Sequence, residues 1–328
     1  MTIGRIAVIG GGAWGTALAQ VAAKAGRDVL LWAMEVDVVE SINSAHENPI
    51  FLPGIPLDPA IRATGKIEDV VGCDAALVVT PAQHMRSVLE KAPRCDMPLV
   101  LCSKGIDERS GQLLHQVAAE ACPGAAVAVL SGPTFAHEVA RGLPTAVTLA
   151  AEDRSIAKQL RDTIARPEFR IYLTGDVAGA EIGGAVKNVL AIACGVVEGR
   201  GLGQNARAAL IARGFAEMTR FGVAMGARPE TLAGLSGLGD LVLTCSSTSS
   251  RNYSLGKGIG EGRSAAELMA DRRTVAEGAF TAPVLAKLAR ERGIDMPIVD
   301  AVDRLLKGAA IDAVVEALLS RPPRSEGV

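Results

Sequence analysis

The sequence predicts an α/β protein in which an N-terminal doubly wound parallel sheet is followed by an all-helical C-terminal domain. Three observations predict this class. Short apolar runs alternate with helical patterns over the first half of the chain, and a glycine-rich turn joins the first run to the first helical pattern. From about residue 176 onward, the apolar residues keep helical spacing instead. We therefore expect two domains, residues 1–178 and residues 179–328.

The first turn carries the pattern G-x-G-x-x-G, formed by Gly10, Gly12 and Gly15, between the apolar strand Arg5–Ile9 and a helix. Gly10 permits the tight turn, Gly12 lets a pyrophosphate approach the backbone, and Gly15 lets the helix pack closely on the strand. The helix would direct its free N–H groups at the phosphates. The pattern predicts a Rossmann-type dinucleotide-binding domain, and a doubly wound domain that binds nothing is the alternative.

The remaining elements follow from the same alternation. Strands are expected at Asp28–Trp32, Ala75–Thr80, Pro98–Ser103, Ala125–Leu130, Thr145–Ala150 and Phe169–Leu173. Helices are expected at Met85–Lys91, Gln112–Ala121, Ile156–Ile164, 182–197, Ala208–Ala224, Ala265–Met269, Ala282–Arg290 and Val299–Leu306. Residues 41–65 are rich in proline turns and predict a loop over the sheet. Residues 320–328 read as a frayed tail.

Composition narrows the function classes. The 328 residues are 49% hydrophobic and 21% charged, with a net charge of −2, which is typical of a globular protein and offers no basic footprint for nucleic acid. No continuous apolar run reaches the roughly 18 residues of a membrane span, and the chain starts without signal-peptide architecture, so we expect a cytoplasmic protein with no membrane insertion. Six cysteines and four histidines lack metal-ligand spacing, so no metal site is expected and the thiols serve as small hydrophobes.

Four polar features do not suit a core. Lys104 follows a predicted parallel strand, where ligands bind, although a lone lysine is commonly just solvated. Lys187 lies within the most apolar helix, where burial would lower its pKa toward the range of proton transfer; a snorkelling lysine is the alternative. Asp240, in a glycine-rich apolar stretch, needs a partner such as Lys187, unless it caps a helix. Residues 246–252 form a hydroxyl-rich loop that ends in Arg251 and Asn252, which suits phosphate, or they form a solvated linker.

Together these features resemble the bacterial type of NAD(P)-dependent glycerol-3-phosphate dehydrogenase. The resemblance runs from about Arg5 to Gly308. Its matching segments are GGGAWGTALA (10–19), SKG (103–105), LSGPTFA (130–136), EIGGAVKNVLAI (181–192), GLGDL (237–241), SRN (250–252) and VAEG (275–278).

The resemblance implies an enzyme that reversibly reduces dihydroxyacetone phosphate to sn-glycerol 3-phosphate for phospholipid synthesis, with NAD or NADP as cofactor. It implies a cytoplasmic homodimer with a dinucleotide-binding domain and a helical substrate domain. Lys187 would be the general acid and base. The substrate would be held by Lys104, Gly132, Thr134, Lys187, Asp240, Ser250, Arg251 and Asn252. By the resemblance, the cofactor would be touched by Ala13, Trp14, Lys104, Ala136, Arg251, Val275 and Glu277. The glycine pattern itself adds Gly10, Gly12 and Gly15, and the acidic residue after the second strand adds Glu35.

One departure from the family concerns the cofactor. Many relatives carry arginine after the Trp-Ala of the second strand, whereas this chain has Met34 and then Glu35, which lies 20 residues past Gly15. A carboxylate there accepts the ribose 2′-hydroxyl and repels a 2′-phosphate, so we expect a preference for NAD over NADP. Two alternatives remain: a 2-hydroxyacid or ketopantoate-type reductase, and a nicotinamide-binding regulator, which would not need a lysine inside an apolar helix.

Overall fold

The structure is a computed structural model that describes residues 3–92, 96–270 and 276–322. The chain forms two compact units. Residues 1–103 and 114–180 make the first, and residues 104–113 and 181–328 make the second. The short segment 104–113 therefore groups with the helical half of the chain although it lies within the sequence of the first half.

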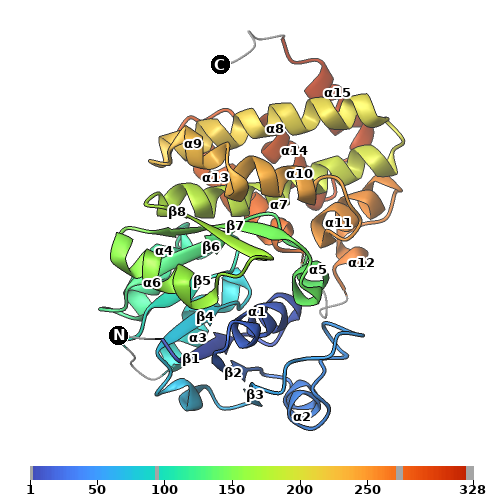
Figure 1. Ribbon diagram of the computed structural model, residues 1–328. Coiled ribbons are helices and arrows are strands. Elements are labelled where there is room, and N and C mark those ends of the chain that lie inside the picture. The colour runs from blue at the N-terminus through green and yellow to red at the C-terminus, as the bar shows by residue number, and fades with distance from the viewer. Residues whose placement is uncertain (1–2, 93–95, 271–275, 323–328) are drawn as a thin grey trace. The chain divides into compact units, whose positions relative to one another are not determined.

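The first unit is built on one eight-stranded sheet in the order β3-β2-β1-β4-β5-β6-β7-β8 (Figure 1). The strands are β1 Arg5–Ile9, β2 Asp28–Trp32, β3 Ile61–Thr64, β4 Ala75–Val78, β5 Leu99–Leu101, β6 Val127–Ser131, β7 Thr145–Ala151 and β8 Phe169–Thr174. The doubly wound α/β class is confirmed, with one correction. The β6–β7 pair is antiparallel, so the sheet is mostly and not wholly parallel. Strands buried on both faces read as apolar runs in either direction, so the pattern could not show this.

The expected loop at residues 41–65 is partly wrong. Helix α2, Val36–Ala45, runs into its start, and β3 forms near its end. β3 lies at the edge of the sheet and has only four residues, of which Ile61 and Ala63 are buried and Arg62 is exposed. So short an alternation among prolines carries too weak a signal to distinguish a strand from a turn.

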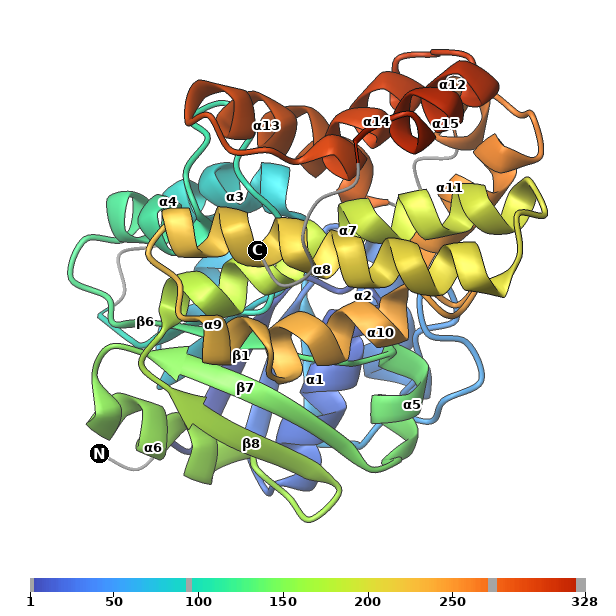
Figure 2. The same cartoon turned by 90° about the horizontal axis from the view of Figure 1, so that it is seen from above.

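The strands place alternate side chains in two hydrophobic cores, one on each face of the sheet. Ile6 and Val8 of β1 belong to the core beneath α1, α2, α5 and α6, whereas Ala7 and Ile9 belong to the core beneath α3 and α4. Figure 2 shows α3 and α4 side by side, as their contacts require. The helices are α1 Ala13–Lys24, α3 Met85–Lys91, α4 Leu114–Ala121, α5 Ala136–Arg141 and α6 Arg154–Ile164, with short turns η1 Ile67–Val70 and η2 Ala82–His84.

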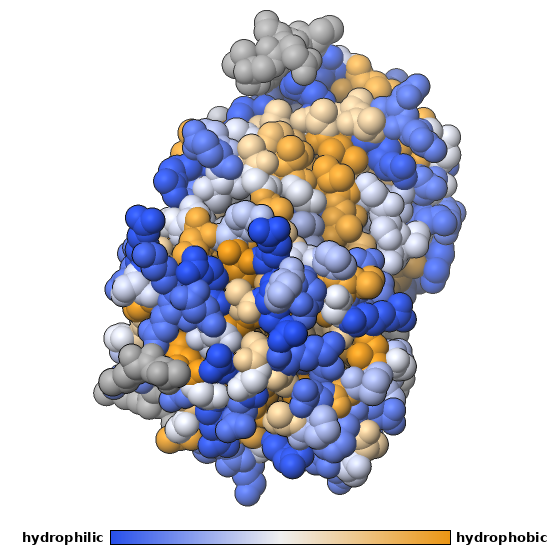
Figure 3. Space-filling model, viewed as in Figure 1, coloured by the Kyte–Doolittle hydropathy of each residue, from blue (hydrophilic) through white to orange (hydrophobic). Residues whose placement is uncertain are grey.

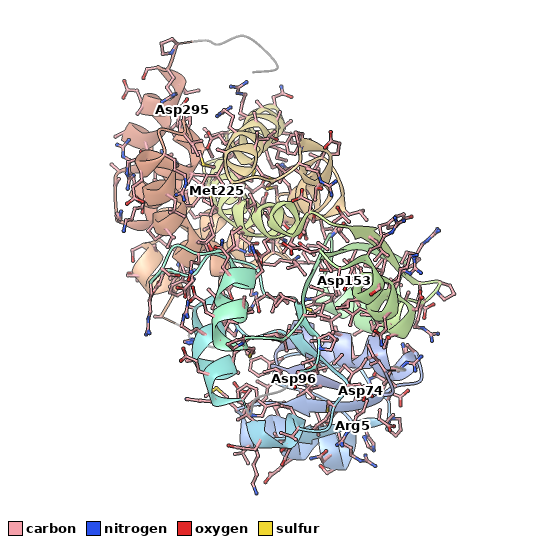
Figure 4. All side chains as sticks on the ribbon, turned by 90° about the vertical axis from the view of Figure 1, so that its left-hand side faces the viewer. Arg5, Asp74, Asp96, Asp153, Met225 and Asp295 are labelled. Atoms are coloured by element: carbon pink, nitrogen blue, oxygen red, sulfur yellow. The ribbon has the colours of Figure 1, made fainter. Side chains whose placement is uncertain are left out.

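Two exposed carboxylates secure element ends in this unit (Figure 4). Asp74, just before β4, accepts hydrogen bonds from the backbone N–H groups of Gly4 and Arg5 at the start of β1. These bonds, led by that from Arg5, hold the pKa of Asp74 below its ordinary value. Asp153 caps α6 by accepting from the N–H of Ser155 and Ile156.

From α7, Val177–Gly199, onward, helices are the regular elements of the second unit's described residues, as expected, whereas the segment 104–113 forms an isolated antiparallel bridge between Ile106 and Leu113. The unit contains most of α7, then α8 Gln204–Ala224, α9 Pro229–Leu232, the π-turn η3 Leu235–Gly239, α10 Asp240–Thr244, α11 Arg251–Gly260, α12 Ala265–Leu268, α13 Glu277–Glu291, α14 Pro297–Leu306 and α15 Ile311–Leu319. Residues 251 and 252, expected in a loop, instead begin α11, because the side chain of Ser250 caps its first turn.

Glycines let α7 and α11 cross with their backbones in contact. A Cβ on Gly195 would lie 2.1 Å from the carbonyl oxygen of Tyr253, and one on Gly256 would lie 1.9 Å from that of Ile192. Because neither position tolerates a side chain, the crossing fixes where the first turn of α11 sits relative to α7.

Helix α7 is the one helix among the described residues that is long and apolar enough to cross a membrane, but all of its apolar window is buried inside the protein. It is therefore the core helix of this unit.

On the face drawn in Figure 3, hydrophilic residues are interspersed with apolar ones.

A buried carboxylate organises the start of α14. Glu217 of α8 is 1% exposed and accepts hydrogen bonds from the backbone N–H groups of Ile298, at 2.8 Å, and Val299, at 3.2 Å. Burial is the largest influence on its pKa, which rises from 4.5 to about 7, because desolvation outweighs the two N–H donors.

We expect this group to make stability depend on pH. The folded state binds a proton at Glu217 more tightly than the unfolded chain, so its contribution to stability is fully present below about pH 4.5 and is lost as the pH rises through about 7. Relative to Glu217→Gln, the wild type should lose up to about 3 kcal/mol of stability between about pH 5 and pH 8. Thermal unfolding of both proteins measures this, and a difference that stays constant with pH would contradict it.

Candidate functional site

Two lysines share one buried carboxylate in the second unit. The Nζ of Lys187 donates to Oδ1 of Asp240 at 2.7 Å, and the Nζ of Lys104 donates to Oδ2 of the same carboxylate at 2.6 Å. The side chain of Asp240 is fully buried, and those of Lys187 and Lys104 are 7% and 15% exposed. The expected pairing of Asp240 with Lys187 is confirmed, and Lys104, which the sequence singled out separately, binds the same carboxylate.

The local fold explains how Asp240 reaches Lys187. The π-turn η3 leads directly into α10, whose first residue is Asp240. A Cβ on Gly183 of α7 would lie 2.5 Å from the carbonyl oxygen of Ser236, so the glycine lets this turn rest against α7 one helical turn before Lys187. The alternative that Asp240 caps a helix is wrong, because Gly239 holds the cap position and the carboxylate is bonded to the lysines.

Burial also tunes the acidity of Lys187. Desolvation is the largest effect and lowers its pKa from 10.5 to about 8; the carboxylate of Asp240 opposes the shift, and the nearby charge of Lys104 adds to it. A group with a pKa near 8 can both give and accept a proton at neutral pH, which is what a general acid and base requires. The cluster also carries one net positive charge, which suits an anionic ligand.

Thr244 and Asn188 belong to the same surroundings, and the sequence analysis missed both. The hydroxyl of Thr244 accepts a hydrogen bond from the Nζ of Lys187 at 2.7 Å. Asn188 accepts from the Nδ2 of Asn252 at 3.0 Å, and Asn252 in turn accepts from the N–H of Gly278. A signal existed for Thr244, because it lies one helical turn after Asp240 on α10.

The first turn of α11 holds the three predicted phosphate-binding residues. Ser250 is buried and its Oγ accepts from the N–H of Tyr253. Arg251 begins the helix and is exposed, and Asn252 is buried. A helix N-terminus with an arginine is a favourable place for a phosphate group.

In the first unit, the glycine-rich turn has the geometry that a dinucleotide needs. Gly10 adopts φ 129°, and a Cβ there would lie 2.9 Å from the carbonyl oxygen of Val79. A Cβ on Gly15 would lie 1.8 Å from the carbonyl oxygen of Gly10, so α1 packs directly on the turn. A Cβ on Gly12 would meet nothing within 4 Å, which leaves open space in front of its backbone.

The position of this turn in the sheet also suits a cofactor. β1 and β4 are neighbours, and the strand order runs in opposite directions from that pair, which is the switch point where doubly wound sheets bind ligands. The Nε1 of Trp14 and the Oγ1 of Thr80 are buried and have no hydrogen-bond partner among the described residues. Two unsatisfied polar atoms beside an open backbone fit a polar ligand better than an apolar one.

The other predicted residues are placed as follows. Glu35 is exposed and holds the cap position of α2, just after β2. Gly132 follows β6, and a Cβ there would lie 2.9 Å from the Cα of Val147, so close packing alone already requires the glycine. Thr134, Ala13, Ala136 and Glu277 are partly exposed, and Ala13, Ala136 and Glu277 begin α1, α5 and α13 respectively. Val275 lies outside the described residues.

Metal ligands do not cluster in the part of the chain that the structure describes, where no group of three or more histidine, cysteine or acidic residues could hold an ion. The five cysteines of that part form no disulfide, and Cys95 lies outside it.

The chain is similar to known proteins over nearly its whole length. Residues 5–157 match the family described as NAD-dependent glycerol-3-phosphate dehydrogenase N-terminus, and residues 176–316 match its C-terminus. The glycerol-3-phosphate dehydrogenase [NAD(P)+] of Erythrobacter litoralis is 66% identical over 98% of this chain and 97% of its own, and that of Novosphingobium aromaticivorans is 64% identical over 98% of both. The crystal structure of glycerol-3-phosphate dehydrogenase from Coxiella burnetii is 37% identical, with a TM-score of 0.92 over 97% of this chain and 99% of that one.

Proposed function

Since the chain belongs to the NAD-dependent glycerol-3-phosphate dehydrogenase family and is an NAD(P)+-dependent oxidoreductase, we propose that it reduces dihydroxyacetone phosphate to sn-glycerol 3-phosphate, reversibly, with Lys187 as the general acid and base. The observation that carries the assignment is the buried Lys187 ammonium, paired with Asp240 and tuned to a pKa of about 8. Family membership also favours this reaction over that of a 2-hydroxyacid or ketopantoate-type reductase.

Lys187 acts on the carbonyl oxygen of the substrate. When bound, the reduced nicotinamide supplies the hydride to the carbonyl carbon. Negative charge then grows on the carbonyl oxygen, where the Lys187 ammonium stabilises it and donates a proton to form the alcohol. Lys187 is left as a neutral amine and regains a proton from solvent before the next turnover. In the reverse direction, the neutral amine removes the hydroxyl proton.

Asp240 and Lys104 prepare this proton donor. Asp240 orients the Lys187 ammonium through the 2.7 Å bond and keeps it charged until the transfer. Lys104 neutralises the second carboxylate oxygen, so Asp240 does not repel an anionic substrate. Gly132 and Thr134 complete the substrate contacts that we propose.

We assign the phosphate of the substrate to the first turn of α11. Arg251 would pair with the phosphate oxygens, and Ser250 and Asn252 would add donors from the same turn. Binding the remote phosphate holds the carbonyl beside Lys187, so part of the binding energy lowers the barrier.

The glycine-rich turn would hold the cofactor. Gly10, Gly12 and Gly15 shape the approach to the pyrophosphate at the start of α1, next to Ala13 and Trp14. Lys104, Ala136, Arg251, Val275 and Glu277 remain proposed cofactor contacts. The domain roles follow: residues 1–178 bind the dinucleotide, and residues 179–328 carry the substrate and Lys187.

We expect NADH to be preferred over NADPH. Glu35 lies after β2, where an acidic side chain accepts the ribose 2′-hydroxyl and repels a 2′-phosphate. Steady-state reduction with each cofactor should give a kcat/KM for NADH at least about tenfold higher. Glu35→Gln should raise kcat/KM for NADPH and so bring the ratio closer to one. Glu40 is also exposed and lies nearby on α2, and Glu40→Gln should leave the ratio unchanged. A clear NADPH preference in the wild type would refute the assignment.

The reaction itself is tested by the absorbance of NADH. Addition of dihydroxyacetone phosphate should start NADH oxidation, and addition of ketopantoate or a simple 2-oxo acid should not. Turnover of those acids at a comparable rate, or no turnover of the phosphorylated ketone with either cofactor, would overturn the proposal. A cytoplasmic location, a homodimeric state and a role in phospholipid synthesis are further proposals that rest on the family resemblance.

A further inference from the structure

We propose that Asn48 is a positioning residue for the cofactor, because its side chain holds the backbone of the glycine-rich turn in place through a buried hydrogen bond. The inference rests on the proposed placement of the dinucleotide at that turn. Asn48 is 0% exposed and lies on the segment between α2 and β3, more than thirty residues beyond the turn it contacts. None of the motifs that point to the cofactor includes it.

Every hydrogen-bonding group of the Asn48 side chain is used in this anchor. Its Nδ2 donates to the carbonyl oxygen of Gly11 at 2.9 Å and to the Oγ1 of Thr16 at 2.8 Å, and its Oδ1 accepts from the N–H of Phe51 at 3.1 Å. Thr16 donates in turn to the same Gly11 carbonyl at 3.3 Å. One carbonyl of the turn therefore receives two buried side-chain donors.

The peptide geometry turns this anchor into a cofactor contact. In a trans peptide, the carbonyl oxygen of Gly11 and the N–H of Gly12 point in opposite directions. Because Asn48 and Thr16 hold the Gly11 carbonyl toward the protein interior, the N–H of Gly12 is held pointing outward. A Cβ on Gly12 would meet nothing within 4 Å, so this residue is open to an approaching pyrophosphate. Asn48 thus pre-orients a donor for the phosphate without touching it.

The experiment measures the Kd of the full-length enzyme for NADH and for ADP-ribose by quenching of tryptophan fluorescence, together with kcat at saturating NADH. Asn48→Ala should raise both Kd values about tenfold, because a turn that is free to rotate must be ordered on binding, whereas kcat and the KM for dihydroxyacetone phosphate should stay within about twofold. Thr16→Val, which removes the second donor but keeps the side-chain shape, should shift the Kd in the same direction, by less. If Asn48→Ala fails to fold, the Kd values of Thr16→Val test the proposal in its place.

Two control variants make the outcome decisive. Asn43 makes equivalent side-chain bonds to the backbone of Ala63 and does not contact the turn, so Asn43→Ala should leave both Kd values unchanged. Gly12→Ala places its Cβ in open space at an ordinary φ of −69°, so it should fold normally and weaken NADH binding. If Gly12→Ala binds NADH normally, the placement of the cofactor fails; if it binds weakly while Asn48→Ala and Thr16→Val bind normally, the role of Asn48 fails.

Discussion

Lys187→Met is expected to lower kcat for the reduction of dihydroxyacetone phosphate by about a thousandfold or more. The substitution removes both the proton donor and the positive charge that stabilises the growing oxyanion. Folding should survive, because methionine has a similar shape and Asp240 retains its bond to Lys104 at 2.6 Å. Stopped-flow or steady-state NADH absorbance measures the rate, and NADH titration should give a Kd within about threefold of the wild type.

Lys257→Met is the matched control for this substitution. Lys257 lies on α11 in the same unit, is partly exposed, and pairs only loosely with Glu261 at 3.8 Å. Its replacement should leave kcat unchanged. Retention of more than about a tenth of the wild-type kcat by Lys187→Met would exclude Lys187 as the proton donor.

Asp240→Asn should lower kcat for reduction at neutral pH by about a hundredfold. The neutral amide leaves two buried ammonium groups facing each other without a carboxylate between them. Because Asp240 is the main influence that raises the pKa of Lys187, its loss should lower that pKa further below about 8, so less of the acid form remains at neutral pH. The pH above which reduction declines should therefore move downward.

Asp303→Asn controls for the loss of a buried, lysine-paired carboxylate. Asp303 is 3% exposed and accepts from Lys307 at 2.7 Å on α14. Its replacement should affect stability and leave the pH profile of reduction in place. A wild-type pH profile in Asp240→Asn would show that the carboxylate does not set the acidity of Lys187.

The sequence indicates which polar residues do not suit a core, but only part of how they are arranged. Lys187 was recognisable because a lysine inside an apolar helix contradicts the surrounding pattern, and Asp240 because a carboxylate in an apolar stretch needs a partner. That Lys104 would bind the second oxygen of the same carboxylate depends on the fold, since the three residues come from separate segments. Thr244 accepts from the Nζ of Lys187 at 2.7 Å, and its one signal in the sequence is its place a helical turn after Asp240, because a threonine in a helix is otherwise ordinary.

The direction of β7, the capping role of Ser250 and the contacts of Asn48 could not be predicted from the sequence, because each depends on how the chain folds. The direction of β7 is set by how the chain returns after α5, which hydropathy does not encode. Ser250 was noticed for its hydroxyl but not for its capping role, because its neighbours Ser247 and Ser249 offered the same chemistry. Asn48 lies within the proline-rich residues 41–65, and nothing in that pattern distinguishes it, because its hydrogen bonds to Gly11 and Thr16 form only once the chain is folded.

Whether the Lys187 amine exchanges the proton with the substrate oxygen can be measured from the pH dependence of kcat in both directions. We expect mirror-image profiles. The rate of reduction should fall as the pH rises through about 8, because the ammonium is lost, and the rate of glycerol 3-phosphate oxidation should rise over the same range, because the free amine forms. Profiles that are flat across this range, or that move in the same direction, would contradict it.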